Sequence, residues 1–176
     1  MSDKQNKRIL VAGATGYLGK YVVKAFKAQG YYVRILARKE KKIYEPGPFT
    51  APALTKADTD DIFIGEVSKP ESLTGLLDSI DMVFSCVGIS RQRDGLTFDQ
   101  VDYQCNKNLI DLCKNSKVKR FVYVSMQGAE NIKHVNYMVN AKDRYEVLKR
   151  IADLNPNIYG IVFCRTRRET KEIANK

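Results

Sequence analysis

The sequence has a single histidine and no closely spaced pair of cysteines, which excludes the common zinc sites. A zinc site draws its ligands mainly from cysteine and histidine, at spacings such as Cys-x-x-Cys. The four cysteines lie in or beside apolar segments, so we interpret them as reduced thiols of the core and expect no metal site. These residues are His134 and Cys86, Cys105, Cys113 and Cys164.

Long apolar runs are also absent. The segments MVFSCVGI and YGIVFC are far shorter than the roughly 20 residues that a membrane-spanning helix needs. The opening MSDKQNKRILVAG has no apolar stretch of the length found in signal peptides. We therefore expect a cytoplasmic protein with no membrane partner, and the length of 176 residues favours a single domain.

Negative charge is in short supply. The chain has 30 lysines and arginines against 20 acidic residues, a formal net charge of +10. Such an excess is typical of proteins that bind nucleic acids or other polyanions. Here it is spread along the chain, which favours solubility or a phosphate-bearing cofactor over a dedicated nucleic-acid surface.

Alternating strand and helix patterns fill the first three quarters of the chain. Continuous apolar runs predict buried strands, and segments with helical spacing of apolar residues separate them. This alternation predicts βαβ units, and hence a doubly wound parallel α/β sheet of about six strands with helices on both faces. The predicted strands cover 8–13, 31–37, 61–67, 81–88 and 118–125, and the predicted helices 17–30, 70–80 and 98–116.

Two local features qualify this pattern. Ser68 and Glu71 have the spacing of a capping box for the helix over 70–80. Residues 38–60 contain three prolines and no periodicity, so they predict a loop long enough to suggest a function or disorder.

A glycine-rich turn, GATGYLG, lies directly between the first predicted strand and helix. One glycine permits the tight turn, one lets main-chain amides approach a pyrophosphate, and one packs the helix against the strand. The helix N-terminus adds a partial positive charge, so the turn predicts a dinucleotide site. It comprises Gly13, Thr15, Gly16, Tyr17, Leu18 and Gly19.

The second strand ends in LARKEKK, where an NAD-binding protein would carry an acidic residue for the 2′-hydroxyl. Arg38, helped by Lys39 or Lys42, could instead pair with a 2′-phosphate, since guanidinium and phosphate match in geometry and charge. The prediction is NADP in preference to NAD, with a solvated basic loop as the alternative.

These segments together resemble atypical or extended short-chain dehydrogenases/reductases of the NmrA-like, NAD(P)-binding kind, over residues 7 to about 128. The resemblance rests on GATGYLG, GEVSKPESL, VFSCVG and VDYQCNKNLIDLCKNSKVKRFVYVS. It implies that Glu66 and Val67 lie near the adenine and that Val87 and Gly88 lie near the nicotinamide ribose. Glu66 replaces the aspartate that is usual in the family.

From about Gly128 the chain resembles instead the start of the second RecA-like domain of DEAD-box RNA helicases. IVFCRTRRET is similar to motif IV of that family, which would place Thr166 and Arg167 near RNA. The chain has no phosphate-binding P-loop and no acidic Walker B strand, so helicase activity is excluded. We interpret the chain as a chimera in which 129–176 completes the sheet, with 158–164 as the sixth strand and 141–154 as the crossover helix.

The resemblance to short-chain reductases implies a tyrosine acid, a lysine one turn later and a serine that holds the carbonyl. Ser125, Tyr145 and Lys149 are the candidates, although Tyr145 falls on the apolar face of its predicted helix and core packing is the simpler explanation for it. Two functions stay open. One is an NAD(P)-dependent oxidoreductase acting on an unidentified small molecule. The other is a non-catalytic dinucleotide-binding or scaffold domain with weak RNA contact through its C-terminal segment.

Overall fold

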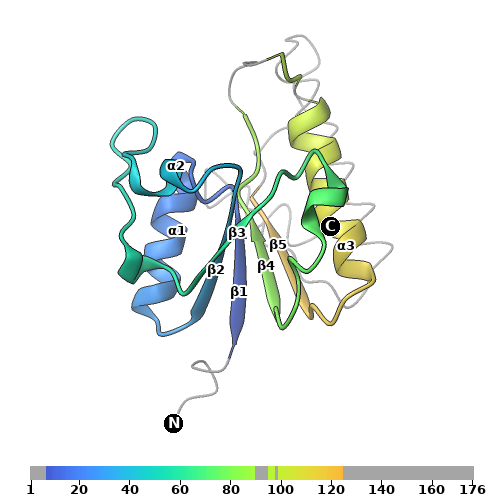
Figure 1. The fold of residues 1–176 in the computed structure, drawn as a ribbon, viewed down its shortest axis with the longest axis horizontal. Helices are drawn as coiled ribbons and strands as arrows, with labels where there is room; N and C mark the ends of the chain where they lie inside the picture. Colours follow the sequence, from blue (N-terminus) through green and yellow to red (C-terminus); the bar gives the residue numbers. More distant parts are fainter. Residues whose placement is uncertain (1–6, 90–94, 98, 125–176) are drawn as a thin grey trace, which may run out of the picture.

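The computed structural model describes residues 7–89, 95–97 and 99–124, and these form a five-stranded parallel sheet between layers of helix (Figure 1). The strands lie in the order β3-β2-β1-β4-β5. Each strand falls within a segment that the sequence predicts as one, so the doubly wound α/β fold is confirmed for this part of the chain. The strands are β1 Arg8–Ala12, β2 Tyr32–Ala37, β3 Asp61–Ile64, β4 Met82–Ser85 and β5 Arg120–Tyr123.

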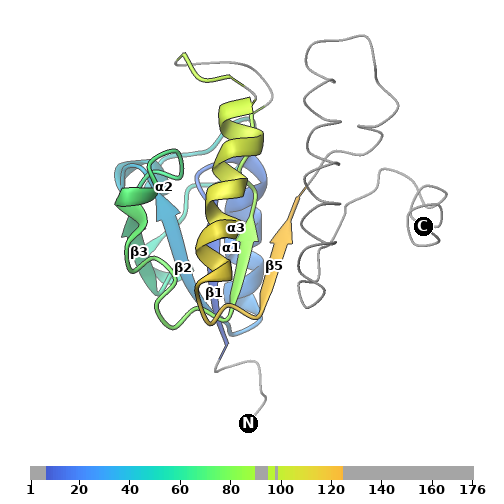
Figure 2. The same ribbon diagram turned by 90° about the vertical axis from the view of Figure 1, so that its right-hand side faces the viewer.

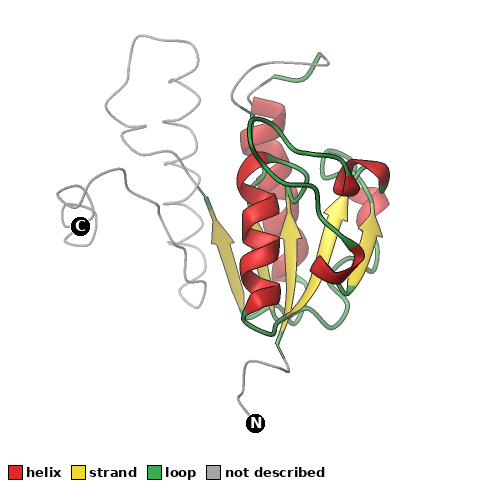
Figure 3. Cartoon of the chain, turned by 90° about the vertical axis from the view of Figure 1, so that its left-hand side faces the viewer, coloured by secondary structure: helices red, strands yellow, loops and turns green. Residues whose placement is uncertain are grey.

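The strand order reverses beside β1, which pairs with β2 on one side and β4 on the other. At its carboxyl end, Ala12 is opposite Leu36 of β2 and Ser85 of β4. All strands point the same way, so the loops that follow them gather at one edge of the sheet (Figure 3). Doubly wound sheets bind their ligands at this kind of reversal, outside the carboxyl ends of the strands.

Both faces of β1 are buried, which explains why its sequence is a continuous apolar run. Residues 9–12 have no exposed surface. Leu10 and Ala12 belong to one core cluster, together with Leu109 of helix α3 (Asn106–Lys114), whereas Ile9 and Val11 belong to a second, together with Val23 of helix α1 (Tyr17–Ala28). Helices therefore cover both faces, as Figure 2 shows.

The helices differ in length and regularity. Helix α1 ends at a turn where Gly30 has a φ of +82°, a conformation that favours glycine. The long helix predicted over 98–116 is present as a π-helical stretch followed by α3. The helices are α1 Tyr17–Ala28, α2 Lys41–Tyr44, η1 Lys56–Asp58, η2 Pro70–Leu73, η3 Asp99–Cys105 and α3 Asn106–Lys114.

The prediction of a capped helix over 70–80 is wrong. Only the single 3₁₀ turn of η2 forms, and no side chain caps it. The Ser68 hydroxyl instead donates to the Glu66 carboxylate over 3.0 Å. Gly75 and Ser79 have φ values of +82° and +60°, so the chain turns twice where a helix would continue.

The predicted loop over 38–60 is more ordered than its prolines suggested, because it contains α2 and η1. The predicted sixth strand and crossover helix lie outside the described residues. Within the described part of the chain, no helix combines the length and apolar character needed to cross a membrane.

Candidate functional site

The turn after β1 packs closely against the main chain at the end of β4. Gly13 has a φ of +77°, and a Cβ atom on it would lie 2.7 Å from the carbonyl carbon of Cys86. The Cys86 amide donates to the Ala12 oxygen over 2.9 Å, which joins the two strands just below the turn. Only glycine fits this position, because a side chain there would collide with main chain that cannot move aside.

The same turn brings helix α1 close to β1. The Gly16 amide donates to the Gly13 oxygen over 3.0 Å. A Cβ on Gly19 would overlap that same oxygen, so Gly19 lets the helix approach the strand. The first turn of α1 has no acidic residue and no side-chain cap, which leaves its amides available to an anion.

Tyr17 and Leu18 begin α1 with exposed side chains, at 45% and 40% of their full accessible surface. The exposure of Leu18 fits a position at the rim of the site, beside the free main-chain amides of the first turn of α1.

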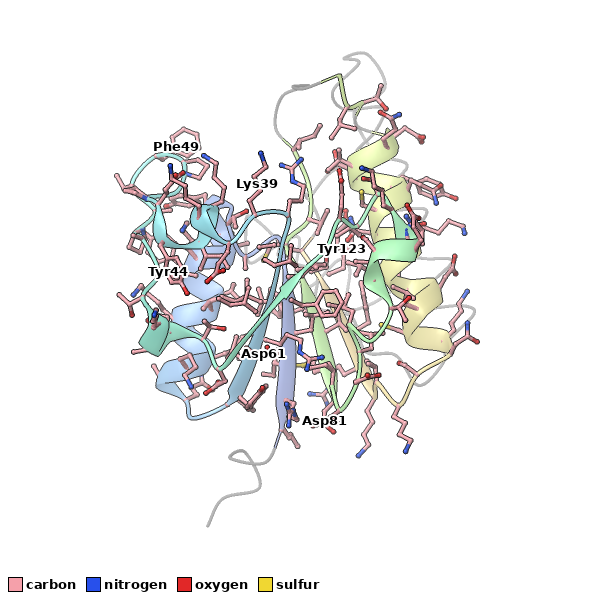
Figure 4. All side chains as sticks on the ribbon, in the orientation of Figure 1. Lys39, Tyr44, Phe49, Asp61, Asp81 and Tyr123 are labelled. Carbon is pink, nitrogen blue, oxygen red and sulfur yellow. The ribbon has the colours of Figure 1, made fainter. Side chains whose placement is uncertain are left out.

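The basic residues after β2 stand at this edge of the sheet. Arg38 and Lys39 are both exposed and directly follow the last strand residue, Ala37. Figure 4 shows Lys39 above the carboxyl ends of the strands, far from Asp61 and Asp81 toward the opposite end. Lys42 differs, because its ammonium pairs with the Glu45 carboxylate at 2.7 Å.

Lys20 is a buried residue beside the site that the sequence analysis missed. It directly follows Gly19, yet it is fully buried. Its ammonium donates to the main-chain oxygens of Ile43 and Glu45, over 2.7 and 2.8 Å. Burial lowers the pKa of Lys20, while the negative charge of Glu45 opposes that shift. A lysine on an amphipathic helix is normally assigned to the solvent face, so no sequence signal indicated this contact.

The loop after β3 carries Glu66 and Val67. The Glu66 carboxylate accepts hydrogen bonds from Lys69 and Ser68, which lower its pKa, and the positive charge of Arg38 adds to the effect. The Val67 main-chain oxygen accepts a hydrogen bond of 2.8 Å from the buried Asn108 side chain. The loop is therefore held from helix α3.

A buried polar network fixes the loop after β4. The Ser85 hydroxyl donates to the Asn106 side-chain oxygen over 2.6 Å, and the Asn106 amide donates to the Val87 oxygen over 3.1 Å. The Ile89 amide donates to the Asp102 carboxylate over 2.9 Å. Val87 and the exposed Gly88 thus lie on a braced loop next to Gly13.

The three cysteines in the described residues are poor nucleophiles. Burial raises the pKa of Cys86 and of Cys113 to about 12 and, with the charges of Glu66 and Asp102, that of Cys105 to about 11. They remain protonated thiols at neutral pH. In the described ranges, no group of three or more His, Cys, Asp and Glu side chains is arranged to hold a metal ion.

The structure thus brings the predicted residues together at the carboxyl edge of the sheet, from the loops after β1, β2, β3 and β4 and from the first turn of α1. These are Gly13, Thr15, Gly16, Tyr17, Leu18, Gly19, Arg38, Lys39, Glu66, Val67, Val87 and Gly88. The predicted catalytic residues, Ser125, Tyr145 and Lys149, lie outside the described residues.

Relatives of this chain include a photosystem II assembly factor of Cyanophora paradoxa and an isoflavone reductase homolog of Nicotiana glauca. The first is 33% identical over 153 residues, which cover 87% of this chain and 44% of the relative. The second is 31% identical over 124 residues, which cover 69% and 36%. The chain therefore spans less than half the length of these curated relatives.

Among solved structures, the UDP-glucuronic acid 4-epimerase from Bacillus cereus, in complex with NAD, is similar in fold. Its TM-score is 0.64 at 19% identity, over 88% of this chain and 55% of that one. A sequence profile of the NmrA-like family matches residues 5–164, which includes most of the segment that resembles a helicase. The chimera accordingly stays a prediction, and by this match the chain belongs to the NmrA-like family.

Proposed function

We propose that this chain is the dinucleotide-binding part of an NmrA-like oxidoreductase and that it binds NADP in preference to NAD. The observation that carries the proposal is the Gly13–Gly19 turn, which lies against the end of β4 at the reversal of strand order. The binding of NAD by the similarly folded epimerase supports the dinucleotide site by analogy, whereas the preference for NADP depends on Arg38 and Lys39.

The first turn of α1 suits a pyrophosphate. Its amides point out of the helix N-terminus, and neither an acidic side chain nor a capping hydroxyl competes for them. Gly16, at the N-cap, would let the phosphates approach the main chain closely. The exposed Leu18 would cover one side of the bound group.

The other loops suit the remaining parts of the coenzyme. Arg38 and Lys39 follow β2, where the adenosine ribose binds in doubly wound folds, and their charges favour a 2′-phosphate. The adenine would lie beside Glu66 and Val67. Val87 and Gly88, on the opposite side of Gly13, would contact the nicotinamide ribose.

Hydride transfer is the reaction that this family resemblance implies. The reduced coenzyme supplies a hydride when bound. Tyr145 would protonate the carbonyl oxygen of the substrate, Lys149 would lower the pKa of that tyrosine, and Ser125 would hold the carbonyl. Loss of carbonyl reduction in Tyr145→Phe, with coenzyme binding retained, supports this assignment. Unchanged turnover would remove Tyr145 from it.

A non-catalytic role is the second candidate. The relative from Cyanophora paradoxa is named as an assembly factor, and this chain spans 44% of its length. A scaffold could use the same bound dinucleotide as a structural element. This second candidate function also includes weak contact with RNA through the C-terminal segment.

Calorimetric titration with NADPH, NADH and a labelled single-stranded RNA, each at two salt concentrations, tests the proposal. Tight binding of NADPH that depends little on salt supports it. RNA binding that weakens steeply with salt, without NADPH binding, supports the scaffold with RNA contact instead. Absence of heat with either coenzyme contradicts the proposal.

A further inference from the structure

The buried Lys20 side chain has no role in the proposed function as stated above. Its ammonium donates to the main-chain oxygens of Ile43 and Glu45 and lies 3.5 Å from that of Lys42. These oxygens belong to the end of α2, where helix carbonyls are left without intrahelical partners. With no exposed surface, Lys20 cannot itself reach a ligand.

The end of α2, which Lys20 binds, also positions the basic residues Arg38 and Lys39. The Lys42 amide donates to the Lys39 oxygen over 3.2 Å, and the Ile43 amide donates to the Glu40 oxygen over 2.9 Å. Residues 39–43 therefore form one hydrogen-bonded unit, with Arg38 directly before it. A contact that fixes the end of this unit therefore also fixes the positions of Arg38 and Lys39.

Lys20 is tied equally closely to the glycine turn. It follows Gly19, and its amide donates to the Gly16 oxygen over 3.3 Å. A single side chain thus connects the predicted pyrophosphate site with the predicted 2′-phosphate site. Burying an ammonium costs free energy that an apolar side chain of similar length would avoid, so packing alone does not require a lysine here.

We propose that Lys20 is a positioning residue for coenzyme selectivity, which holds Arg38 and Lys39 at the spacing from the α1 N-terminus that a 2′-phosphorylated dinucleotide needs. This inference rests on the proposed function, because it assigns to Lys20 the geometry on which the preference for NADP depends. It concerns the ratio of the affinities for NADPH and NADH, and not whether a coenzyme binds at all.

The test is the ratio of the dissociation constants of NADH and NADPH, measured by calorimetry on the full chain and on Lys20→Met. Methionine keeps the length of the stem and removes the ammonium. We expect the ratio to fall by about tenfold, mostly through weaker NADPH binding, because charge-assisted contacts depend strongly on geometry. Competition by 2′,5′-ADP against 5′-AMP should show the same loss of preference.

Lys24→Met is the matched control, since Lys24 lies one turn later on α1 and pairs with Asp58 at 3.0 Å instead of holding the basic loop. It should leave the ratio unchanged. A folded Lys20→Met that keeps the full ratio overturns this inference alone. A wild-type chain that binds both coenzymes equally overturns the proposed preference for NADP and this inference with it.

Gly47→Ala tests the contact from the other side, should Lys20→Met fail to fold. A Cβ on Gly47 would lie 2.8 Å from the Cβ of Ala51 and 2.9 and 3.0 Å from Cδ and Cε of Lys20, so the added methyl group crowds the Lys20 stem while the charge is kept. We expect an intermediate loss of the ratio. A ratio equal to that of the wild type in this variant also overturns the inference.

Discussion

The side-chain amide of Asn108 donates to the main-chain oxygen of Val67 over 2.8 Å, across 41 residues of sequence. Asn108 lies on α3, and Val67 lies in the loop proposed to contact the adenine. Asn106, two residues earlier, holds the Val87 oxygen on the opposite side of Gly13. Helix α3 therefore braces two of the four loops of the site from behind.

Asn108→Ala should loosen the loop after β3. The Val67 oxygen loses its partner, so we expect a loss of about 1–2 kcal/mol in the free energy of unfolding. NADPH affinity should weaken several-fold, as measured by urea denaturation and calorimetry. Asn115→Ala is the control, because the Asn115 side-chain amide donates to the Asp111 oxygen of the same helix. Equal effects of the two variants would contradict the bracing role.

Asn106→Ala should cost more stability. It removes the acceptor of the buried Ser85 hydroxyl and the donor to the Val87 oxygen. Leaving buried polar groups unpaired costs about 1–3 kcal/mol. The double variant Ser85→Ala/Asn106→Ala should recover part of this loss, because the hydroxyl then no longer needs a partner. Strictly additive losses in urea denaturation would argue against a coupled network.

Gly13→Ala should abolish coenzyme binding and destabilise the chain. Its added Cβ meets the Cys86 main chain at 2.7 Å. Gly95→Ala is a matched control, because Gly95 also has a positive φ, +73°, but has open space around its Cβ position. The control should show only the strain of about 1–2 kcal/mol that a left-handed conformation imposes on alanine. A Gly13→Ala variant that binds NADPH like the wild type would refute the close approach.

Arg38→Ser should change coenzyme preference without unfolding the protein, since Arg38 is exposed. We expect NADPH affinity to fall by about tenfold and NADH affinity to change little, because only NADPH carries the 2′-phosphate. The preference should also decline with added salt in the wild type and much less in the variant. A parallel loss for both coenzymes would place Arg38 elsewhere in the site.

The thiols of Cys86, Cys105 and Cys113 should react slowly at neutral pH. Their pKa values of about 11 to 12 exceed the ordinary value of 9.0, so few thiolates form in the folded state. Above pH 9.0 these thiols ionise in the unfolded chain but stay protonated in the folded chain. The free energy of unfolding therefore falls as the pH rises from 9.0 to the folded pKa values. Labelling with a thiol reagent in a Cys164→Ser background checks this. Rapid labelling of the folded protein at pH 7 would contradict it.

Strand β1 was predictable because burial on both faces leaves an apolar run, as in residues 9–12. The glycine turn was predictable for a similar reason, since close approach of main chain excludes every other residue at Gly13 and Gly19. Both signals are local in sequence.

The supporting contacts were not predictable. Lys20, Asn106 and Asn108 look like solvent-facing residues of amphipathic helices, and only the tertiary structure brings main-chain oxygens to them. The predicted helix over 70–80 failed because Ser72 donates to Lys69 and Glu66 oxygens and Gly75 turns the chain. Propensity and spacing do not report such competing contacts.

The central claim is that the main-chain amides at the start of α1 bind a diphosphate. Amide chemical shifts of Tyr17, Leu18 and Gly19, followed by NMR during titration with NADPH, test it most directly. The account predicts large, saturable shifts at these three amides, with smaller ones at Gly95 and Asn115. Saturating NADPH that leaves the three amides unmoved would contradict it.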